Sequence, residues 1–336
     1  MTAFDSTESY CGTTSLLAMS APHDMNGTLS HEPLVTLEFQ RFPRSGVLGE
    51  LARHRCASLS VESDRAVPSD KVLQQILQDP FVPIDLRRNG RGMESQVRFE
   101  GATLRQAQLQ WLKCRDVALR EATDLMAQGV HKQTVNRVLE PWRRVNLVMS
   151  TTLLGSILTL RMAPDVQPEF QRIARNIVTA VSGRKSGSIV PQEWTELRSV
   201  HLPYVTPVDF ATIETPRDAL IHSVARCARA TYGRNGIVAS LAEDAALVLR
   251  LQSEESPREY ECAGWCNVRQ EYVSRIATTD ECIHASPMEH VALPDRCANL
   301  GTGGNFGARW SQLRHNEPLR QYVLSRARDI VARGAK

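Results

Sequence analysis

The longest helical pattern in the chain runs from Thr103 to Gln128. Apolar residues recur there near a 3.6-residue spacing, and Gly129 follows as a natural stop. Because no proline interrupts this stretch, the pattern predicts one long helix, around which the shorter elements must be arranged.

Other segments alternate between strand and helix patterns. Val35–Phe39 alternates as a strand does, and Gly46–Ala52 is expected to be a short helix that delivers Arg53, His54 and Arg55 at its C-terminal end. We expect a buried strand at Val145–Ser150 and a buried helix at Leu153–Leu160. Further helices are expected at Ser69–Leu77, Pro168–Val181, 216–232, 241–252 and the C-terminal end.

Composition shifts suggest a domain plan. Residues 1–33 lack periodicity and are expected to be a flexible arm. Residues 34–183 would form the core, and 184–215, rich in Gly, Pro, Ser and Thr, a linker. A second segment would cover 216–312, with an acidic, cysteine-containing insertion at 253–283, and 313–336 would be a C-terminal helix.

The overall composition and net charge argue against several classes of protein. Among 336 residues, 42% are hydrophobic and 23% charged, which is ordinary for a globular chain, and a net charge of +3 does not call for nucleic acid or an anionic membrane. The apolar run from Val145 to Leu160 is interrupted by polar residues, so no membrane span is expected. No signal peptide is visible, and the eight scattered cysteines are expected to be reduced cytoplasmic thiols.

A cluster of cations and hydroxyls lies between Arg53 and Arg65. Arg53, His54 and Arg55 stand in a row, and three serines separate them from Arg65. Guanidinium groups suit phosphate and hydroxyls add lateral hydrogen bonds, so an anion site for a phosphorylated ligand is one interpretation. A solvated basic loop is the alternative.

The order of these residues resembles the signature of the flavin-dependent thymidylate synthases, R-H-R-x-x-S-x-N-E-x-S-x-R-Y. The match holds at Arg53, His54, Arg55, Ser58, Ser63 and Arg65. Ser60, Val61 and Ala66 depart from it, and Glu62 stands one position after the family carboxylate.

Further stretches are similar to motifs of the same family. Arg137-Val138-Leu139-Glu140-Pro141 is similar to R-[IV]-[VL]-L-P, and the stretch ending at Arg161, with 165–169 after it, is similar to N-x-x-x-L-R…H-A-Q-x-E. Residues 284–290 are close to H-x-[ST]-P-F-E-H, and 227–232 resemble A-A-R-V-S-F. The last two motifs usually precede R-H-R, so their position here indicates a circular permutation, which termini that lie close together tolerate.

The resemblance implies an α+β fold with a mixed sheet, long helices and permuted motif order. It also implies C5-methylation of UMP or dUMP with FAD, NADPH and 5,10-methylenetetrahydrofolate, by a homotetramer with shared active sites. Arg161 would be catalytic, by stabilising the deprotonated pyrimidine. The nucleotide would be bound by Glu50, Arg53, Ser63, Arg65, Arg137 and Arg161. The flavin would be bound by Arg53, His54, Arg55, Glu62, Ser156, Thr231, His284, Ser286 and His290.

The departures from the pattern leave alternatives open. Ser60, Val61 and Ser156 replace family residues, which points to a paralogue such as the uridylate methylases of polyoxin-type nucleoside antibiotic pathways. An ordinary dUMP-to-dTMP synthase and a nucleotide-binding paralogue without flavin turnover are the rivals. A glycine pattern at 301–307 faintly resembles a dinucleotide loop, and Cys262, Cys266, Cys282 and His284 have irregular zinc-ligand spacing, so we expect no metal.

Overall fold

The computed structural model describes most of the chain. The described residues are 10–20, 33–54, 56–90, 97–163, 166–182, 190–191, 193–194, 197, 199–231, 239–251, 260–266, 271–277, 286–294, 306 and 310–334. For residues 260–266, 271–277 and 286–287 and a few positions at helix ends, the backbone alone is described.

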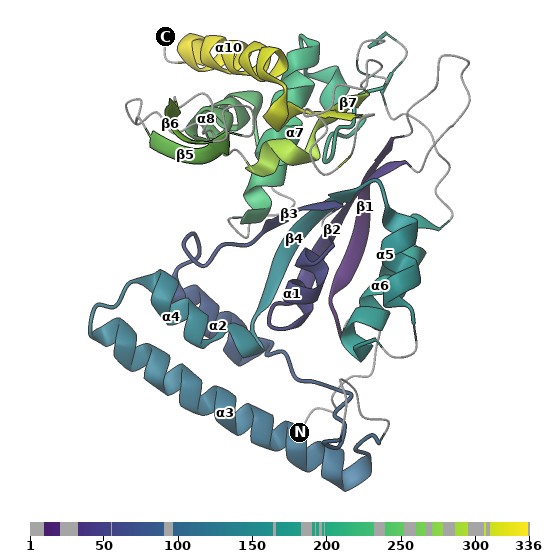
Figure 1. Ribbon diagram of the computed structural model, residues 1–336, viewed down its shortest axis with the longest axis vertical. Coiled ribbons are helices and arrows are strands. Elements are labelled where there is room, and N and C mark those ends of the chain that lie inside the picture. The colour runs from purple at the N-terminus through teal and green to yellow at the C-terminus, as the bar shows by residue number, and fades with distance from the viewer. Residues whose placement is uncertain are drawn as a thin grey trace.

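A four-stranded sheet forms the centre of the molecule (Figure 1). Its strands are β1 (Thr13–Ser20), β2 (Leu34–Pro43), β3 (Ala57–Val61) and β4 (Arg144–Thr151), in the order β1-β2-β4-β3. Every neighbouring pair in this sheet is antiparallel, so the expectation of a mixed sheet was wrong. The reason is that β4 inserts between β2 and β3, which run in the same direction but do not touch.

Residues 13–20, which were expected to belong to a flexible arm, instead form strand β1. It pairs with β2 at the edge of the sheet, with an irregularity between Leu16 and Ala18. Only Leu16 of this strand is buried, so the sequence shows no alternation by which the strand could have been recognised.

One face of the sheet is apolar and carries the main core. Leu37, Phe39, Leu147 and Met149 point to this face and are almost completely buried. They pack against α6 (Pro168–Val181), which, with α5 (Leu154–Arg161), covers this side in Figure 1. Helix α5 was expected to be buried but buries only Leu154 and Ile157, because its other side faces outward.

The opposite face of the sheet is polar yet buried. Thr36, Glu38, Ser58, Ser60 and Ser150 all lie there with little exposed surface. Helix α7 (Pro216–Thr231) packs over β3 and β4 on this side, followed by η4 (Ser286–His290). These buried hydroxyls therefore need partners from the second half of the chain.

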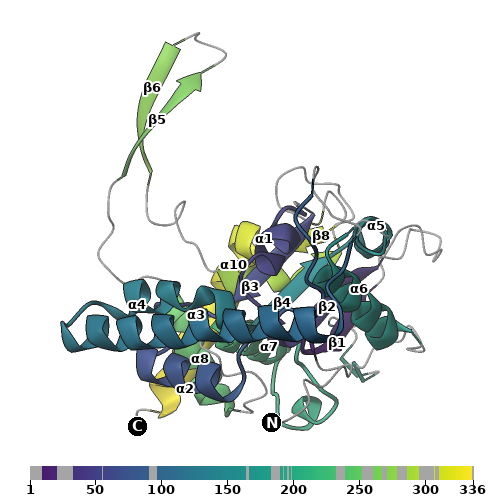
Figure 2. The same cartoon turned by 90° about the horizontal axis from the view of Figure 1, so that it is seen from below.

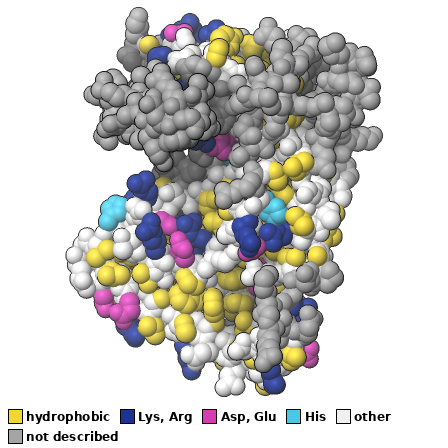
Figure 3. Space-filling model, in the orientation of Figure 1, with side chains coloured by type: hydrophobic (Ala, Val, Ile, Leu, Met, Phe, Trp, Pro, Cys, Tyr) yellow, Lys and Arg dark blue, Asp and Glu magenta, His cyan; other side chains and the backbone are white. Residues whose placement is uncertain are grey.

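Two of the three helices below the sheet, α2 (Ser69–Gln78) and α3 (Gly101–Ala127), were predicted from the sequence, and the third, α4 (Lys132–Val138), was not. Helix α3 packs with α2 and α4 in one core, where the centroids of the tilted Trp111 and Trp142 rings lie 5.7 Å apart. Helix α3 keeps apolar side chains such as Leu109 and Val117 on its exposed side. Figure 3 shows hydrophobic side chains over this lower part of the molecule and a band of charged side chains above it.

The second half of the chain forms a helical body on the polar face. Helices α7, α8 (Leu241–Leu251) and α10 (Glu317–Gly334) share one core, as the sequence predicted for three helices in these regions. Short strands β7 (Ala292–Pro294) and β8 (Trp310–Gln312) pair beside it. The insertion at 253–283 contains a hairpin, β5 (Tyr260–Cys266) and β6 (Glu271–Ala277), that projects away from the body in Figure 2.

Candidate active site

Two helix ends bring the predicted catalytic residue and several predicted binding residues together. Helix α1 (Val47–Ala52) presents Glu50 and ends immediately before Arg53 and His54, and α5 ends at Arg161. Arg161 donates from Nε to Nε2 of His54 at 2.8 Å and from Nη1 to the Glu50 carboxylate at 3.1 Å. A third donor, Nη2, reaches the Glu50 carbonyl at 3.2 Å, so the guanidinium plane is fixed on α1.

An aromatic ring supports the same arginine. The Arg161 guanidinium carbon lies 4.8 Å from the centroid of Phe170, at the start of α6. The side chain retains 17% exposure, so it is held in place without being sealed from a ligand. Sequence reasoning did not assign Phe170 a role, because only the packing of α5 on α6 places its ring there.

The electrostatics of this cluster follow from its contacts. Burial, and then the neighbouring Arg161 charge, lower the pKa of His54, in keeping with a neutral ring that accepts from Arg161 at Nε2. The hydrogen bond from Arg53, at 2.8 Å, is the largest cause that lowers the pKa of the Glu50 carboxyl. The cluster thus presents two cations, one anion and one neutral imidazole at the surface.

The predicted phosphate residues lie after β3 and on α4. Ser63 Oγ accepts from the backbone N–H of Arg65 at 3.2 Å, and Arg65 Nε donates to Gln133 Oε1 at 3.2 Å. Arg137 is exposed one helical turn beyond Gln133, so it shares the face of α4 that Arg65 approaches. The structure therefore gathers these two arginines and Ser63 on one side of α4.

A buried ion pair anchors the loop that carries these residues. Arg143 is fully buried and donates to Glu62 at 2.7 Å and to Asp64. Arg44 also donates to Asp64, at 2.7 Å, and Asn136 holds the Asp64 carbonyl at 3.0 Å. Arg143, Arg44 and Asp64 were missed from the sequence, because charged residues give no sign there of being buried together.

His290 and Glu62, two predicted flavin residues, contact other side chains inside the protein. His290 is fully buried, with Nδ1 2.8 Å from Ser150 Oγ and Nε2 2.9 Å from Ser60 Oγ. Glu62 is the partner of Arg143. Both side chains support the fold in this structure, and their predicted contact with a flavin stays a prediction.

The hydrogen bonds of His290 continue into a chain across the sheet. Ser150 contacts Thr36 at 2.5 Å, Thr36 contacts Nε2 of His201 at 2.7 Å, and His201 Nδ1 contacts Ser20 at 2.9 Å. Burial lowers the pKa of both His201 and His290 to about 3. These two rings therefore connect the second half of the chain to the polar face of the sheet through hydrogen bonds.

Of the remaining predicted flavin residues, the structure describes the side chain of Ser156 alone. Ser156 is exposed on α5, five residues before Arg161. Thr231 ends α7 and Ser286 begins η4, but the side chains of both lie outside what the structure describes, as do Arg55 and His284 altogether. The cysteines considered for zinc also lie in segments without described side chains. Among the described residues, no group of His, Cys, Asp or Glu could hold a metal, and no helix is long and apolar enough to cross a membrane.

The chain matches known proteins over its first half. A family model described as thymidylate synthase complementing protein matches residues 11–184. The chain is also similar to the UMP/dUMP methylase PolB from Streptomyces cacaoi, solved with 5-bromo-dUMP, at 18% identity over 50% of this chain and 88% of that chain, with a TM-score of 0.38. It is similar to ThyX from Helicobacter pylori, solved with FAD and dUMP, at 23% identity over 45% of this chain and 68% of that chain, with a TM-score of 0.31.

None of the curated proteins matches the chain. The matched family region contains the R-H-R stretch, Arg137 and Arg161, the residues on which the resemblance was first based. Because that region exceeds half of the chain, the protein belongs to the thymidylate synthase complementing protein family and is an enzyme of the flavin-dependent thymidylate synthase type.

Proposed function

We propose that the protein methylates C5 of a uridine 5′-monophosphate, UMP or dUMP. The observation that carries this proposal is the fixed Arg161 guanidinium at the ends of α1 and α5. Methylenetetrahydrofolate would supply the carbon, and NADPH would reduce the flavin. A role in nucleoside antibiotic synthesis and assembly into a homotetramer remain predictions from the family resemblance.

Arg161 would act on the pyrimidine ring. C5 becomes nucleophilic when the uracil loses its N3 proton, and a positioned cation stabilises the resulting negative charge. In the structure, Arg161 is oriented by His54 and Glu50 before any ligand arrives, so little reorganisation is needed. Ser63, Arg65 and Arg137 would hold the 5′-phosphate from the side of α4.

Two of the four free cysteines that the structure describes, Cys11 and Cys227, do not favour the alternative route through a thiolate nucleophile. Burial raises the pKa of Cys11 to about 12 and raises that of the fully buried Cys227 further above its usual range. Because the thiolate and not the thiol attacks, these two residues are unsuited to the task. The oriented guanidinium of Arg161 supports activation without a thiolate.

The surface around the cluster fits a flavin cofactor. The Arg53 side chain is 72% exposed, Ser156 is exposed, and the partly buried His54 contacts Arg161. Guanidinium, hydroxyl and imidazole donors suit a pyrophosphate and a heteroaromatic ring. When bound, the flavin would supply the hydride that reduces the transferred carbon to a methyl group.

The test is tritium release from C5-labelled dUMP and UMP, side by side, with FAD, NADPH and methylenetetrahydrofolate. Release from either nucleotide would establish substitution at C5, and the ratio would separate a dUMP-specific thymidylate synthase from a uridylate methylase. The absence of release from both, with folded protein, would favour a nucleotide-binding paralogue without turnover.

A further inference from the structure

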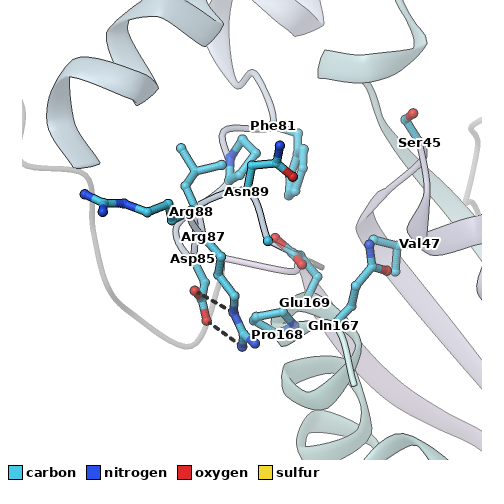
Figure 4. A pocket seen from close by; sticks show the side chains of 13 residues that line it. Ser45, Val47, Phe81, Asp85, Arg87, Arg88, Asn89, Gln167, Pro168 and Glu169 are labelled. Atoms are coloured by element: carbon cyan, nitrogen blue, oxygen red, sulfur yellow. Dashed lines mark hydrogen bonds and ion pairs between the residues drawn. The ribbon is translucent and has the colours of Figure 1, made fainter. Parts of the chain in front are cut away.

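Two cavities of the protein differ in the character of their walls. The cavity in Figure 4, of about 420 Å³, lies between α1, the segment 81–90 and the start of α6, and its wall contains the Asp85–Arg87 ion pair at 3.3 Å. A cavity of about 440 Å³ on the helical body is instead lined by aliphatic and proline side chains, with one tyrosine and one asparagine. No part of the proposed reaction uses this apolar cavity.

The apolar cavity is built mainly by the N-terminal parts of two helices. Pro216 and Leu220 come from α7, and Pro318, Leu319 and Tyr322 come from α10. Because both helices belong to one packed core, they hold these side chains in fixed positions. The remaining wall is formed by Leu197, Val200, Leu293 of β7 and Asn316.

The cavity has a packed floor and an open mouth. Leu197, Val200 and Leu220 are buried members of the core of the helical body. Pro318 is exposed and Tyr322 is 39% exposed, so these two residues lie at the mouth. The volume falls within the range of about 300–1,000 Å³ that small-molecule sites occupy, and branched aliphatic walls favour an apolar tail.

A cation lies at the mouth of this cavity. The guanidinium carbon of Arg217 is 3.3 Å from the centroid of the Tyr322 ring. Within the part of the chain that the structure describes, Arg217 has no carboxylate partner, because the acidic side chains on either side of it pair with Arg326 instead. These are Glu214, at 2.9 Å, and Asp218, at 2.8 Å. The N–H groups of Arg217 therefore remain available to an anion.

We propose that the apolar cavity binds an aliphatic carboxylate. The tail would lie on the apolar floor, and the carboxylate would pair with Arg217 at the mouth. The amide of Asn316 is already engaged, since it donates to Ser311 Oγ at 2.8 Å and accepts from a backbone N–H of α10 at 3.1 Å, so Arg217 is the head-group contact. The inference does not depend on the proposed methylation, because none of these residues has a part in it.

The experiment is calorimetric titration of the full-length protein with octanoate, butanoate and 1-octanol. Octanoate should bind, and butanoate should bind at least about 100-fold more weakly, since each methylene group removed weakens binding about fourfold. Arg217→Gln should weaken octanoate about tenfold and leave 1-octanol unchanged, because only the carboxylate pairs with the guanidinium. Arg328→Gln, at an exposed position further along α10, is the matched control and should bind octanoate like the unaltered protein.

A second variant tests the cavity itself. Leu293 lines the cavity from β7 and is partly buried, and phenylalanine is well suited to a strand. In Leu293→Phe the larger ring would occupy space that the tail needs. Octanoate should therefore bind at least about tenfold more weakly to this variant, with its thermal unfolding preserved.

Several results would overturn the proposal. Octanoate affinity that is unchanged in both Arg217→Gln and Leu293→Phe would place the ligand elsewhere, and equal affinity for octanoate and 1-octanol would remove the head-group role of Arg217. The absence of octanoate binding to the unaltered protein would reject the site outright. If Leu293→Phe, while stably folded, then sedimented as a smaller species than the unaltered protein, the cavity would belong to an interface between two copies of the chain.

Discussion

Arg161 shows how a single residue is prepared for its role by neighbours distant in sequence. Two of its donor nitrogens contact Glu50 on α1, the third contacts His54 just after that helix, and its guanidinium lies over Phe170. Glu50 is its anionic partner and His54 its hydrogen-bonding partner. The identity of these partners follows only from the meeting of two helix ends.

Arg161→Ala should lower tritium release by about 10²-fold or more, because the cation that stabilises the developing charge is removed. Flavin absorbance of the purified protein should be retained, since other residues would hold the cofactor. Arg120→Ala, on the exposed side of α3, should leave both properties unchanged. Full turnover in Arg161→Ala would remove this residue from the mechanism.

Gly12 is a position where the backbone requires glycine. Its φ is +79°, and an added Cβ would meet the Gln40 carbonyl oxygen of β2 at 1.9 Å. Gly12→Ala should therefore destabilise the protein by at least about 2 kcal/mol, measured by urea unfolding. Gly49→Ala, on α1 with open space around it, should be neutral or stabilise by up to about 1 kcal/mol. Equal effects of the two changes would contradict this account.

At the scale of elements, Arg143 joins β4 to the loop after β3. It is fully buried, and its two carboxylate partners flank Ser63 along the chain. The loop that carries Ser63 and Arg65 is thereby fixed to the sheet. Arg143 acts as a positioning residue for the predicted phosphate site.

Arg143→Met should destabilise the protein by about 3–5 kcal/mol, because Glu62 and Asp64 lose the cation between them while remaining buried. The free energy of unfolding in urea is the measurement. Arg120→Met on α3 is the control, with an expected change within about 0.5 kcal/mol. A loss below about 1 kcal/mol for Arg143→Met would show that the carboxylates reach water or other donors without it.

At the scale of the whole molecule, two buried histidines join the helical body to the sheet. His201 and His290 reach Thr36, Ser150 and Ser60 on the polar face. Burial lowers the pKa of both rings from 6.5 to about 3, so the folded protein keeps them neutral while the unfolded chain protonates them. Their contribution to stability is complete above pH 6.5 and declines as the pH falls toward 3.

Acidification from pH 7 to pH 5.5 should therefore lower the protein's free energy of unfolding by about 1 kcal/mol for each of these two histidines. His290→Asn should lose less stability over this interval than the unaltered protein, by about that amount. His131→Asn is the control, because His131 is an exposed helix cap that asparagine can replace. If all three proteins lost equal stability, the buried rings would not be the acid-sensitive contacts.

The sequence by itself determined most of the long helices, strands β2 and β4, and the family. Local spacing is enough to predict α3, α6 and α7, because an amphipathic helix repeats its pattern within a few residues. The order of Arg53, Arg65, Arg137 and Arg161 was enough to indicate the family that the comparison then confirmed.

Tertiary structure alone decided which side chains meet. The edge strand β1, the insertion of β4 between β2 and β3, and the burial of Arg143 have no local signature in the sequence. The same holds for His290, whose motif suggested a cofactor contact and whose ring lies between Ser60 and Ser150. These contacts join residues that are tens to hundreds of positions apart, so their geometry depends on how the whole chain packs.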